Sequence, residues 1–473
     1  MTDILIKDGF VATMDRQRTV YRRGSVHIQD GRIAEVGERV SARPDPEIVI
    51  DAGHKVVLPG FVNAHAHLQQ YFRGVYELIG EFYKVNLPLE GYRQAEDMET
   101  MGLASCAEFL YGGCTTAMVI YTYPDGFARS AEQAGNRLLL AADIEEVDLA
   151  RLAEGVYDYL PAKGAAAYQR AVELYENWHG AAGGRITTLM APKAPDLATP
   201  ETYRKCHAFA RERGLRMTTH LSQSWREVEQ VGRLVGKTPP QHLHDLGILD
   251  ERLTGAHCTY ATETDTQLIA RSGMGILHCR AVTNPLQRWV DLGIPIGLGT
   301  DDYFHDMFQL MRENLAGQAA RALLIEGAEE KLAVDRRTFR PTYYDLLEMA
   351  TRGGAEALGI DGEAGSLEPG KKADLILVDM LSPYLTPTLD PLTSIVLYAT
   401  PADVDTVLVD GRILKRDGRL TTLDRARVLT EAQARVEEII ARFFHEHPEQ
   451  RQAWEQKAPY MAGRFALEPL TEA

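Results

Sequence analysis

Short apolar runs alternate with longer amphipathic stretches through the middle of the chain. The runs are typical of strands buried on both faces, whereas the stretches between them carry apolar residues at helical spacing. Eight such runs occur, at residues 62–64, 113–120, 137–144, 186–191, 215–219, 253–256, 275–277 and 294–299. Because strands that alternate with helices form parallel sheets, this pattern predicts an α/β protein with a TIM (β/α)8 barrel rather than an open sheet.

Both ends of the chain show a different pattern, in which short strands are separated by turns. The N-terminal strands flank an Asp30-Gly31 turn, and a matching strand-turn-strand pattern returns around Asp410-Gly411. We therefore expect the two ends to share one sheet. The predicted domains are a small composite β-sandwich from residues 1–57 and 362–422, the barrel over 58–361, and a C-terminal helix and tail over 423–473.

Two helical patterns follow the last predicted barrel strand. The first covers residues 343–358 and ends before Gly359, a residue typical of helix C-termini. The second is charged and covers residues 424–444. Each is predicted to form one continuous helix.

The composition excludes several classes of partner. The 473 residues include 67 acidic and 51 basic ones, so the net charge of −16 repels phosphate backbones and argues against nucleic acid. No apolar run approaches the ~18 residues of a membrane span and no secretory signal is recognised, so we expect a cytoplasmic protein without membrane contacts. The five cysteines lack Cys-x-x-Cys spacing and are expected to be buried thiols without disulfides.

The chain contains two His-x-His triplets that differ in context. His65 and His67 end an extended run, and residues two apart in a strand face the same side, so this pair can bind one metal ion. His242 and His244 lie in a helical stretch, where side chains two apart point in nearly opposite directions. Only the first pair is therefore a candidate for metal binding.

Four later strand-like runs each end in a residue that can bind a metal or move a proton: His220, His257, His278 and Asp301. The C-terminal ends of barrel strands converge on one face, where active sites lie. A single histidine at such a place is often a hydrogen-bonded core residue. The complete set, together with the His65 and His67 pair, instead predicts a centre for a divalent metal.

The order of these motifs resembles the amidohydrolase superfamily. The matching segments are Pro-Gly-Phe-Val-Asn-Ala-His-Ala-His at 59–67, Thr-His-Leu-Ser at 219–222, Gly-Ala-His-Cys at 255–258, Gly-Leu-Gly-Thr-Asp at 297–301, and residues 364–374. The resemblance implies a hydrolase in which His65, His67, His220 and Asp301 bind one divalent ion. It also implies that His257 positions the hydroxide or polarises the substrate and that Asp301 transfers a proton. Zinc is the first expectation for the ion, and cobalt, iron and manganese suit the same ligands.

Two residues depart from the pattern of the superfamily. Gln223 stands where its deaminases commonly carry a glutamate that moves protons to the substrate ring, and an amide cannot transfer a proton. Lys193, at the end of the fourth strand, stands where related enzymes often carry histidine. We expect Lys193 to bind substrate or to pair with Asp196. A carboxylated Lys193 that bridges two metals is the alternative.

The segment after His67 resembles the corresponding loop of phenylurea hydrolases and of the thiocarbamate (molinate) hydrolase. This places the chain nearest that branch and predicts hydrolysis of the carbonyl C–N bond of a urea-type small molecule such as a phenylurea. Tyr71, Lys193, Gln223 and His278 are the expected substrate contacts.

Other functions remain open at this point. The alternatives are C–S hydrolysis of a thiocarbamate, and aminohydrolase or chlorohydrolase action on an azine or purine ring, which Gln223 disfavours. A barrel that serves only as a binding scaffold is disfavoured because all expected ligand positions are filled. The resemblance also implies a homo-oligomer.

Overall fold

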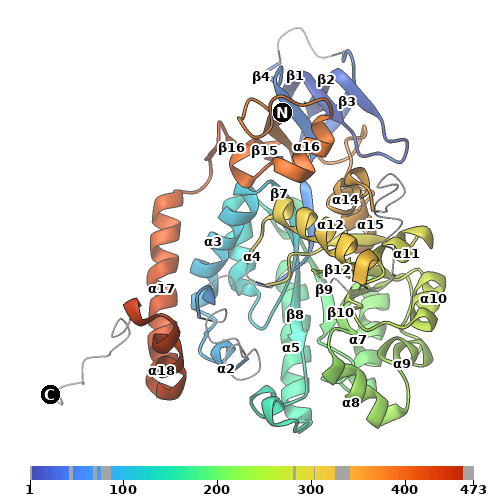
Figure 1. Cartoon of the computed structure of the whole chain (residues 1–473), viewed down its shortest axis with the longest axis vertical. Helices are drawn as coiled ribbons and strands as arrows, with labels where there is room; N and C mark the ends of the chain where they lie inside the picture. The colour runs from blue at the N-terminus through green and yellow to red at the C-terminus, as the bar shows by residue number, and fades with distance from the viewer. Residues whose placement is uncertain are drawn as a thin grey trace, which may run out of the picture.

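The computed structural model describes residues 3–41, 46–67, 72–75, 87–280, 284–302, 304–324 and 341–461. Its two sheets are an eight-stranded parallel sheet and a nine-stranded mixed sheet. Figure 1 shows the mixed sheet above the helices and strands of the barrel, with both ends of the chain contributing to it. Among the helices in these ranges, none is long and apolar enough to cross a membrane.

The barrel strands follow one another around the parallel sheet in the order of the sequence. They are β6 (Phe61–Ala66), β7 (Cys114–Tyr121), β8 (Arg137–Ile144), β9 (Ile186–Pro192), β10 (Met217–Leu221), β11 (Leu253–His257), β12 (Gly275–His278) and β13 (Ile296–Leu298). Every residue of β7 and β8 is buried, as expected for strands covered on both faces. The predicted fold class is confirmed, and all eight predicted strands are present.

Helices lie between the barrel strands along the chain, and a further one follows the last strand. They are α2 (Leu87–Glu90), α3 (Asp97–Tyr111), α4 (Asp125–Ala134), α5 (Pro161–Trp178), α6 (Ala181–Gly184), α7 (Pro200–Arg213), α8 (Trp225–Val235), α9 (Pro239–Asp245), α10 (Glu263–Ser272), α11 (Leu286–Asp291) and α12 (Met307–Leu324). Side-chain caps start several of them. The Ser224 hydroxyl, for example, accepts from the Glu227 N–H at the start of α8, and Gly236 ends that helix with a left-handed residue.

The mixed sheet joins the two ends of the chain, as the sequence predicts. Its strands are β1 (Asp3–Ala12), β2 (Val20–Gln29), β3 (Arg32–Gly37), β4 (Ile48–Asp51), β5 (Lys55–Pro59), β14 (Leu375–Asp379), β15 (Val404–Val409), β16 (Arg412–Arg416) and β17 (Arg419–Leu420). β5 pairs in parallel with β1 and antiparallel with β14, so it links the N-terminal and C-terminal strands. The sheet has a hydrophobic core of its own, separate from those of the barrel. The domain limits given above stay predictions.

The helix predicted over 343–358 is divided into α14 (Tyr343–Met349) and α15 (Arg352–Leu358). Thr351 leaves the helical region, with φ −131° and ψ −99°, and its hydroxyl donates to the carbonyl of Leu347 at 2.7 Å. The break lets α15 pack under the barrel, where a Cβ on Gly353 would lie 2.5 Å from the carbonyl oxygen of Ile296. The sequence pattern missed this break because both halves keep helical periodicity.

The C-terminal segment is helical and packs against the barrel. α17 (Arg425–Glu446) lies along α3 and is followed by α18 (Pro448–Lys457), on the left of Figure 1. Shorter elements are α16 (Pro391–Tyr398) and the 3-10 helices η3 (Leu149–Glu154), η5 (Pro401–Asp403) and η6 (Pro459–Met461). All five cysteines are buried free thiols.

A buried ion pair fastens the barrel to the mixed sheet. Arg137, at the start of β8, donates from Nε to Asp374 Oδ2 at 2.7 Å and from Nη2 to Asp410 Oδ1 at 2.8 Å. The side chains of Arg137 and Asp374 are 7% and 2% exposed. Since a charge left alone in such a place is strongly unfavourable, the three groups depend on one another.

We expect Arg137→Leu to lower the free energy of unfolding by about 3–5 kcal/mol, because the buried carboxylate of Asp374 loses its counter-charge, whereas Asp410 keeps Lys372 at 3.2 Å. Urea denaturation followed by circular dichroism measures the loss. Arg16→Leu is the matched control: Arg16 pairs with Glu356 but is 72% exposed, so its removal should cost about 1 kcal/mol or less. Equal losses in the two variants would contradict the structural role assigned to Arg137.

Candidate metal centre

The barrel closes through main-chain hydrogen bonds between residues that carry candidate ligands. Asp301 N–H donates to the carbonyl of His65 at 2.9 Å, and His67 N–H donates to the carbonyl of Asp301 at 3.1 Å. Gly299 allows this approach, because a Cβ there would lie 2.6 Å from the Cβ of His65. Strand closure thus brings His65, His67 and Asp301 to one point at the C-terminal end of the barrel.

The imidazole rings of His67 and His220 meet the ring of His65 at this point. The Nε2 atoms of His67 and His220 are 3.1 Å apart. Their Nδ1 atoms lie 3.1 Å from the carbonyl oxygen of Ile120 and 2.8 Å from that of Lys193, respectively. A carbonyl only accepts hydrogen bonds, so both Nδ1 atoms carry the proton and both Nε2 atoms present lone pairs. Two lone pairs that face each other at this distance repel, and a cation between them removes the repulsion.

His65 and Asp301 complete the group. His65 is fully buried, and neither of its ring nitrogens has a hydrogen-bond partner. Asp301 Oδ1 lies 3.7 Å from His65 Nε2 and 3.6 Å from His67 Nε2. Burial lowers the pKa of His65 and, together with neighbouring charges, the pKa of His67 to about 3, so both rings are neutral. Three neutral imidazoles and a carboxylate fit a divalent ion such as zinc.

His257 lies beside this group, at the end of β11. Its ring centroid is 5.4 Å from that of His65, and its Nε2 has no hydrogen-bond partner. The backbone is left-handed at His257 and at Cys258, with φ of 73° and 52°. Such a conformation is unfavourable for residues other than glycine and is often found at functional positions.

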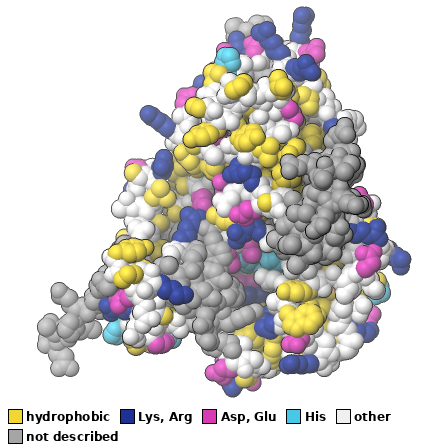
Figure 2. All heavy atoms as spheres, in the orientation of Figure 1, with side chains coloured by type: hydrophobic (Ala, Val, Ile, Leu, Met, Phe, Trp, Pro, Cys, Tyr) yellow, Lys and Arg dark blue, Asp and Glu magenta, His cyan; other side chains and the backbone are white. Residues whose placement is uncertain are grey.

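A cavity of about 720 Å³ opens beside these residues, lined by Gln223, His257, Cys279, Asp301, Glu313 and others. Figure 2 shows histidine side chains near the middle of the molecule, among acidic and basic ones. Gln223 stands in the turn after β10. Glu227 supports this turn by accepting from the N–H groups of Ser222 at 2.7 Å and Gln223 at 2.8 Å. Burial raises the pKa of Glu227, and the negative charge of Asp196 raises it further, to about 8.

Lys193 directly follows β9. The sequence analysis offered Asp196 as its partner, but the two side chains do not pair. Its ammonium is 2.8 Å from Glu145 Oε2 and 3.4 Å from Asp143 Oδ2, whereas Asp196 pairs with Arg226. Burial acts to lower the pKa of Lys193, but these two carboxylates and Glu90 together raise it. Because carboxylation requires an uncharged amine, the ion pairs oppose a bridging carbamate.

His278 does not reach the cavity. Its ring is fully buried, Nε2 contacts the Asn314 side-chain oxygen, and Nδ1 lies 2.9 Å from the amide nitrogen of Asn284. Burial lowers its pKa to about 4. The same amide of Asn284 donates to the carbonyl of His257 at 2.9 Å, so His278 supports the backbone of His257. The expected contact of His278 with substrate finds no support in this placement. Tyr71 lies outside the described residues.

The structure also adds residues that the sequence analysis missed. Asp143 and Glu145 follow the same rule as the predicted ligands, since they stand at the C-terminal end of a barrel strand. Cys279 directly follows β12 and was read only as a buried thiol. Glu227 carries no comparable sequence signal, because its role depends on the shape of the turn after β10.

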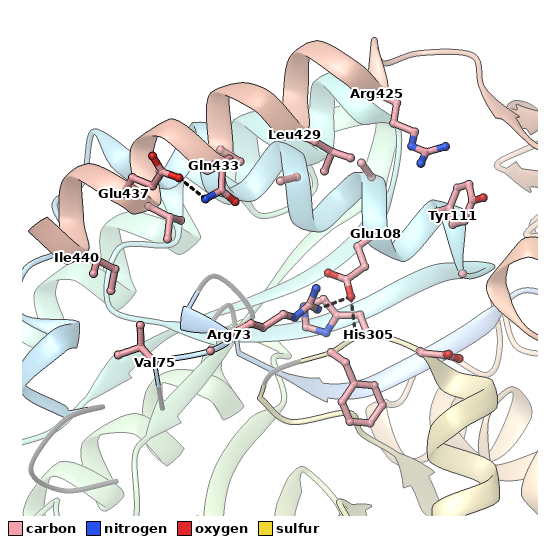
Figure 3. Close-up of a pocket in the computed structure, with 18 of the residues that line it drawn as sticks. Arg73, Val75, Glu108, Tyr111, His305, Arg425, Leu429, Gln433, Glu437 and Ile440 are labelled. Carbon is pink, nitrogen blue, oxygen red and sulfur yellow. Dashed lines mark hydrogen bonds and ion pairs between the residues drawn. The ribbon is translucent and has the colours of Figure 1, made fainter. Parts of the chain in front are cut away.

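A second cavity, of about 810 Å³, lies between α3, α17 and the segment after Asp301 (Figure 3). Glu108 in its wall accepts from Arg73 at 2.7 Å and from the N–H of His305 at 3.1 Å. It is larger than the first cavity, but none of the candidate ligands lines it. The candidate metal centre therefore opens to the smaller cavity.

The chain folds as a (β/α)8 barrel in which imidazoles and a carboxylate surround one point beside an open cavity. This combination defines it as a metal-dependent hydrolase. The amidohydrolase family matches residues 56–414, and the chain belongs to this family.

Two relatives are deaminases of adenine nucleosides. The 5'-deoxyadenosine deaminase of Methanosarcina mazei is 32% identical over 93% of this chain and 99% of its own length. The 5-methylthioadenosine/S-adenosylhomocysteine deaminase of Symbiobacterium thermophilum is 34% identical over 94% and 100%. They correct the placement of the chain nearest the phenylurea and thiocarbamate hydrolases.

Solved structures agree with the fold. A zinc-bound adenosine deaminase from Xanthomonas campestris has a TM-score of 0.81 and 25% identity, over 93% of this chain and 98% of its own. A zinc complex of atrazine chlorohydrolase from Arthrobacter aurescens has a TM-score of 0.80 over 92% and 100%, and its 23% identity supports the fold alone.

We expect wild-type protein to hold about one divalent ion per chain and His67→Ala to lose it, since the imidazole that faces His220 is removed. The affinity should fall by more than the ~100-fold typical of losing an outer partner of a metal ligand. Mass spectrometry of dialysed protein measures the metal content. His244→Ala, an exposed histidine of the helical triplet on α9, should keep the ion. Full metal content in His67→Ala would refute this ligand set.

Proposed function

We propose that this protein is an aminohydrolase that removes an amino group from a purine or a related nitrogen ring. The observation that supports this most is the identity of above 30%, over more than nine-tenths of the chain, to deaminases of adenine nucleosides. The substrate is then a small molecule. Ring deamination thereby becomes the main proposal, in place of the urea hydrolysis expected from the loop after His67.

His65, His67, His220 and Asp301 would hold one divalent ion, with zinc as the proposed metal. When bound, such an ion lowers the pKa of water to about 7 and polarises the group under attack. The neutral rings of the three histidines suit this role because only the unprotonated nitrogen binds a metal. The Nδ1–H groups of His67 and His220 donate to main-chain carbonyls, so in both rings Nε2 is the nitrogen that faces the ion.

Asp301 is the proposed proton carrier. Its carboxylate takes a proton from the attacking water and delivers it to the departing amine, so the ring amine and water become a ring carbonyl and ammonia. The unpartnered Nε2 of His257 is available to hydrogen-bond the oxygen that the reaction adds to the ring carbon. Both residues belong to the same cavity wall.

Gln223 and Lys193 are the proposed contacts to the ring. The exposed Gln223 carboxamide lines the cavity and can hydrogen-bond a ring nitrogen, although it cannot transfer a proton to it. Lys193 stays charged between Asp143 and Glu145 and can donate hydrogen bonds. The ring is thus oriented by two donors from neighbouring strands.

A second candidate function follows from Gln223. A urea or thiocarbamate carbonyl needs no protonation of a ring nitrogen, and a thiolate leaves without proton assistance. The amide at this position therefore favours cleavage of such a carbonyl as the runner-up. Assembly into a homo-oligomer and a cytoplasmic location stay predictions.

We expect wild-type protein to release ammonia slowly from 5'-deoxyadenosine and 5-methylthioadenosine. Gln223→Glu should raise kcat/KM by about 10²–10⁴-fold, because the carboxyl group can protonate the ring. A coupled ammonia assay measures both, and Gln223→Met, which fills similar volume without a donor, is the control. Ammonia from neither protein, with aniline released from a phenylurea by wild type, would overturn ring deamination in favour of the second candidate.

A further inference from the structure

Cys279 gives the cavity a thiol next to the candidate metal centre. It follows β12, is 3% exposed and lines the same cavity as His257 and Asp301. Ligand atoms of His65, His257 and Cys279 all lie within 4.8 Å of one another. This group overlaps the candidate metal centre only at His65.

The ring of His257 is the second observation that points to a ligand here. The residue is 5% exposed, and its Nε2 has no hydrogen-bond partner. The thiol of Cys279 contacts the carbonyl of Leu277 at 3.7 Å, a weak interaction two residues back along the chain. A buried imidazole nitrogen and a buried thiol thus lie close together without a strong partner.

We propose that His257 and Cys279 form a second metal site, selective for thiophilic divalent ions such as Cd²⁺ or excess Zn²⁺, and that an ion bound there inhibits the enzyme. Imidazole and thiolate are the ligands that such ions prefer. Bonds of about 2.3 Å to sulfur and about 2.0 Å to nitrogen place the two ligand atoms roughly 3.5 Å apart. The ligand atoms of His257 and Cys279 lie within 4.8 Å of each other, so an ion bound between them requires a shortening of about 1 Å at most.

Two further groups define the surroundings of this second site. His65 and Asp301 both serve the candidate metal centre, so the second ion completes its coordination with solvent that enters the cavity. Binding replaces the S–H bond of Cys279 with a sulfur–metal bond and releases one proton to solvent. Inhibition follows because the ion occupies the nitrogen of His257 that the proposed reaction needs.

Protein carrying one equivalent of Zn²⁺ is titrated with Cd²⁺, and the ultraviolet thiolate-to-cadmium charge-transfer band is recorded together with binding heat and zinc release. Wild type should bind about one Cd²⁺ per chain, with the band and without loss of zinc. Cys279→Ser should keep its zinc, lack the band and tolerate at least about tenfold more Cd²⁺ before inhibition. Cys206→Ser, which removes a buried thiol of α7, should behave as wild type.

Three outcomes would overturn the second site: a full band in Cys279→Ser, no band in wild type, or zinc displaced by Cd²⁺ without a band. The candidate metal centre is judged separately, since its failure would appear as wild-type protein that holds no zinc before cadmium is added. Deamination is judged separately again, because the band and the stoichiometry require no turnover.

Discussion

The closure of the barrel between β6 and β13 is the constraint on which the site depends. The N–H of Asp301 and the carbonyl of His65 share one hydrogen bond, and the N–H of His67 and the carbonyl of Asp301 share another. Nearby, the Asn63 side chain accepts from the Thr300 N–H at 3.0 Å and donates to the Thr300 hydroxyl at 2.7 Å. The same bonds that close the sheet therefore set the spacing of the ligands. Unsatisfied buried groups cost about 1–3 kcal/mol each, and a cation bound to His65 offsets that cost.

Sequence reasoning could predict the barrel and the histidine cluster because both depend on local periodicity and on a topological rule. His65 and His67 follow strand alternation, while His220, His257 and Asp301 follow the rule that strand C-termini share one face. Sequence reasoning could not predict which partners the polar side chains contact. Whether Lys193 meets Asp196 or Glu145, and whether His278 faces the cavity or Asn284 and Asn314, depends on side-chain directions that periodicity does not encode. The loop after His67 misled the choice of branch, because its resemblance reflects a short segment, whereas the relatives match over the whole chain.

Two groups of side chains flank the candidate metal centre. On the side of β8 and β9, Asp143, Glu145 and Lys193 form an ion-pair group whose charges act on His220. On the side of β10 and β11, Gln223 and His257 offer groups without strong partners. The proposed reaction therefore assigns the proton transfer to Asp301, whose carboxylate lies 3.6 Å from His67 Nε2. The glutamate expected in deaminases would add a second carrier, so in the proposed reaction Gln223 would limit which leaving groups the protein can expel.

The backbone at His257 explains how its ring is held without side-chain hydrogen bonds at Nε2. Left-handed residues other than glycine cost on the order of 1–3 kcal/mol, and two stand in succession here. The Asn284 amide offsets this cost by holding the carbonyl of His257, while the buried His278 ring holds the same amide. The direction of the imidazole is thus imposed by the main chain and by residues beneath it. Its outer nitrogen is left without a hydrogen-bond partner, and both the proposed hydrolysis and the proposed inhibiting ion depend on this one atom.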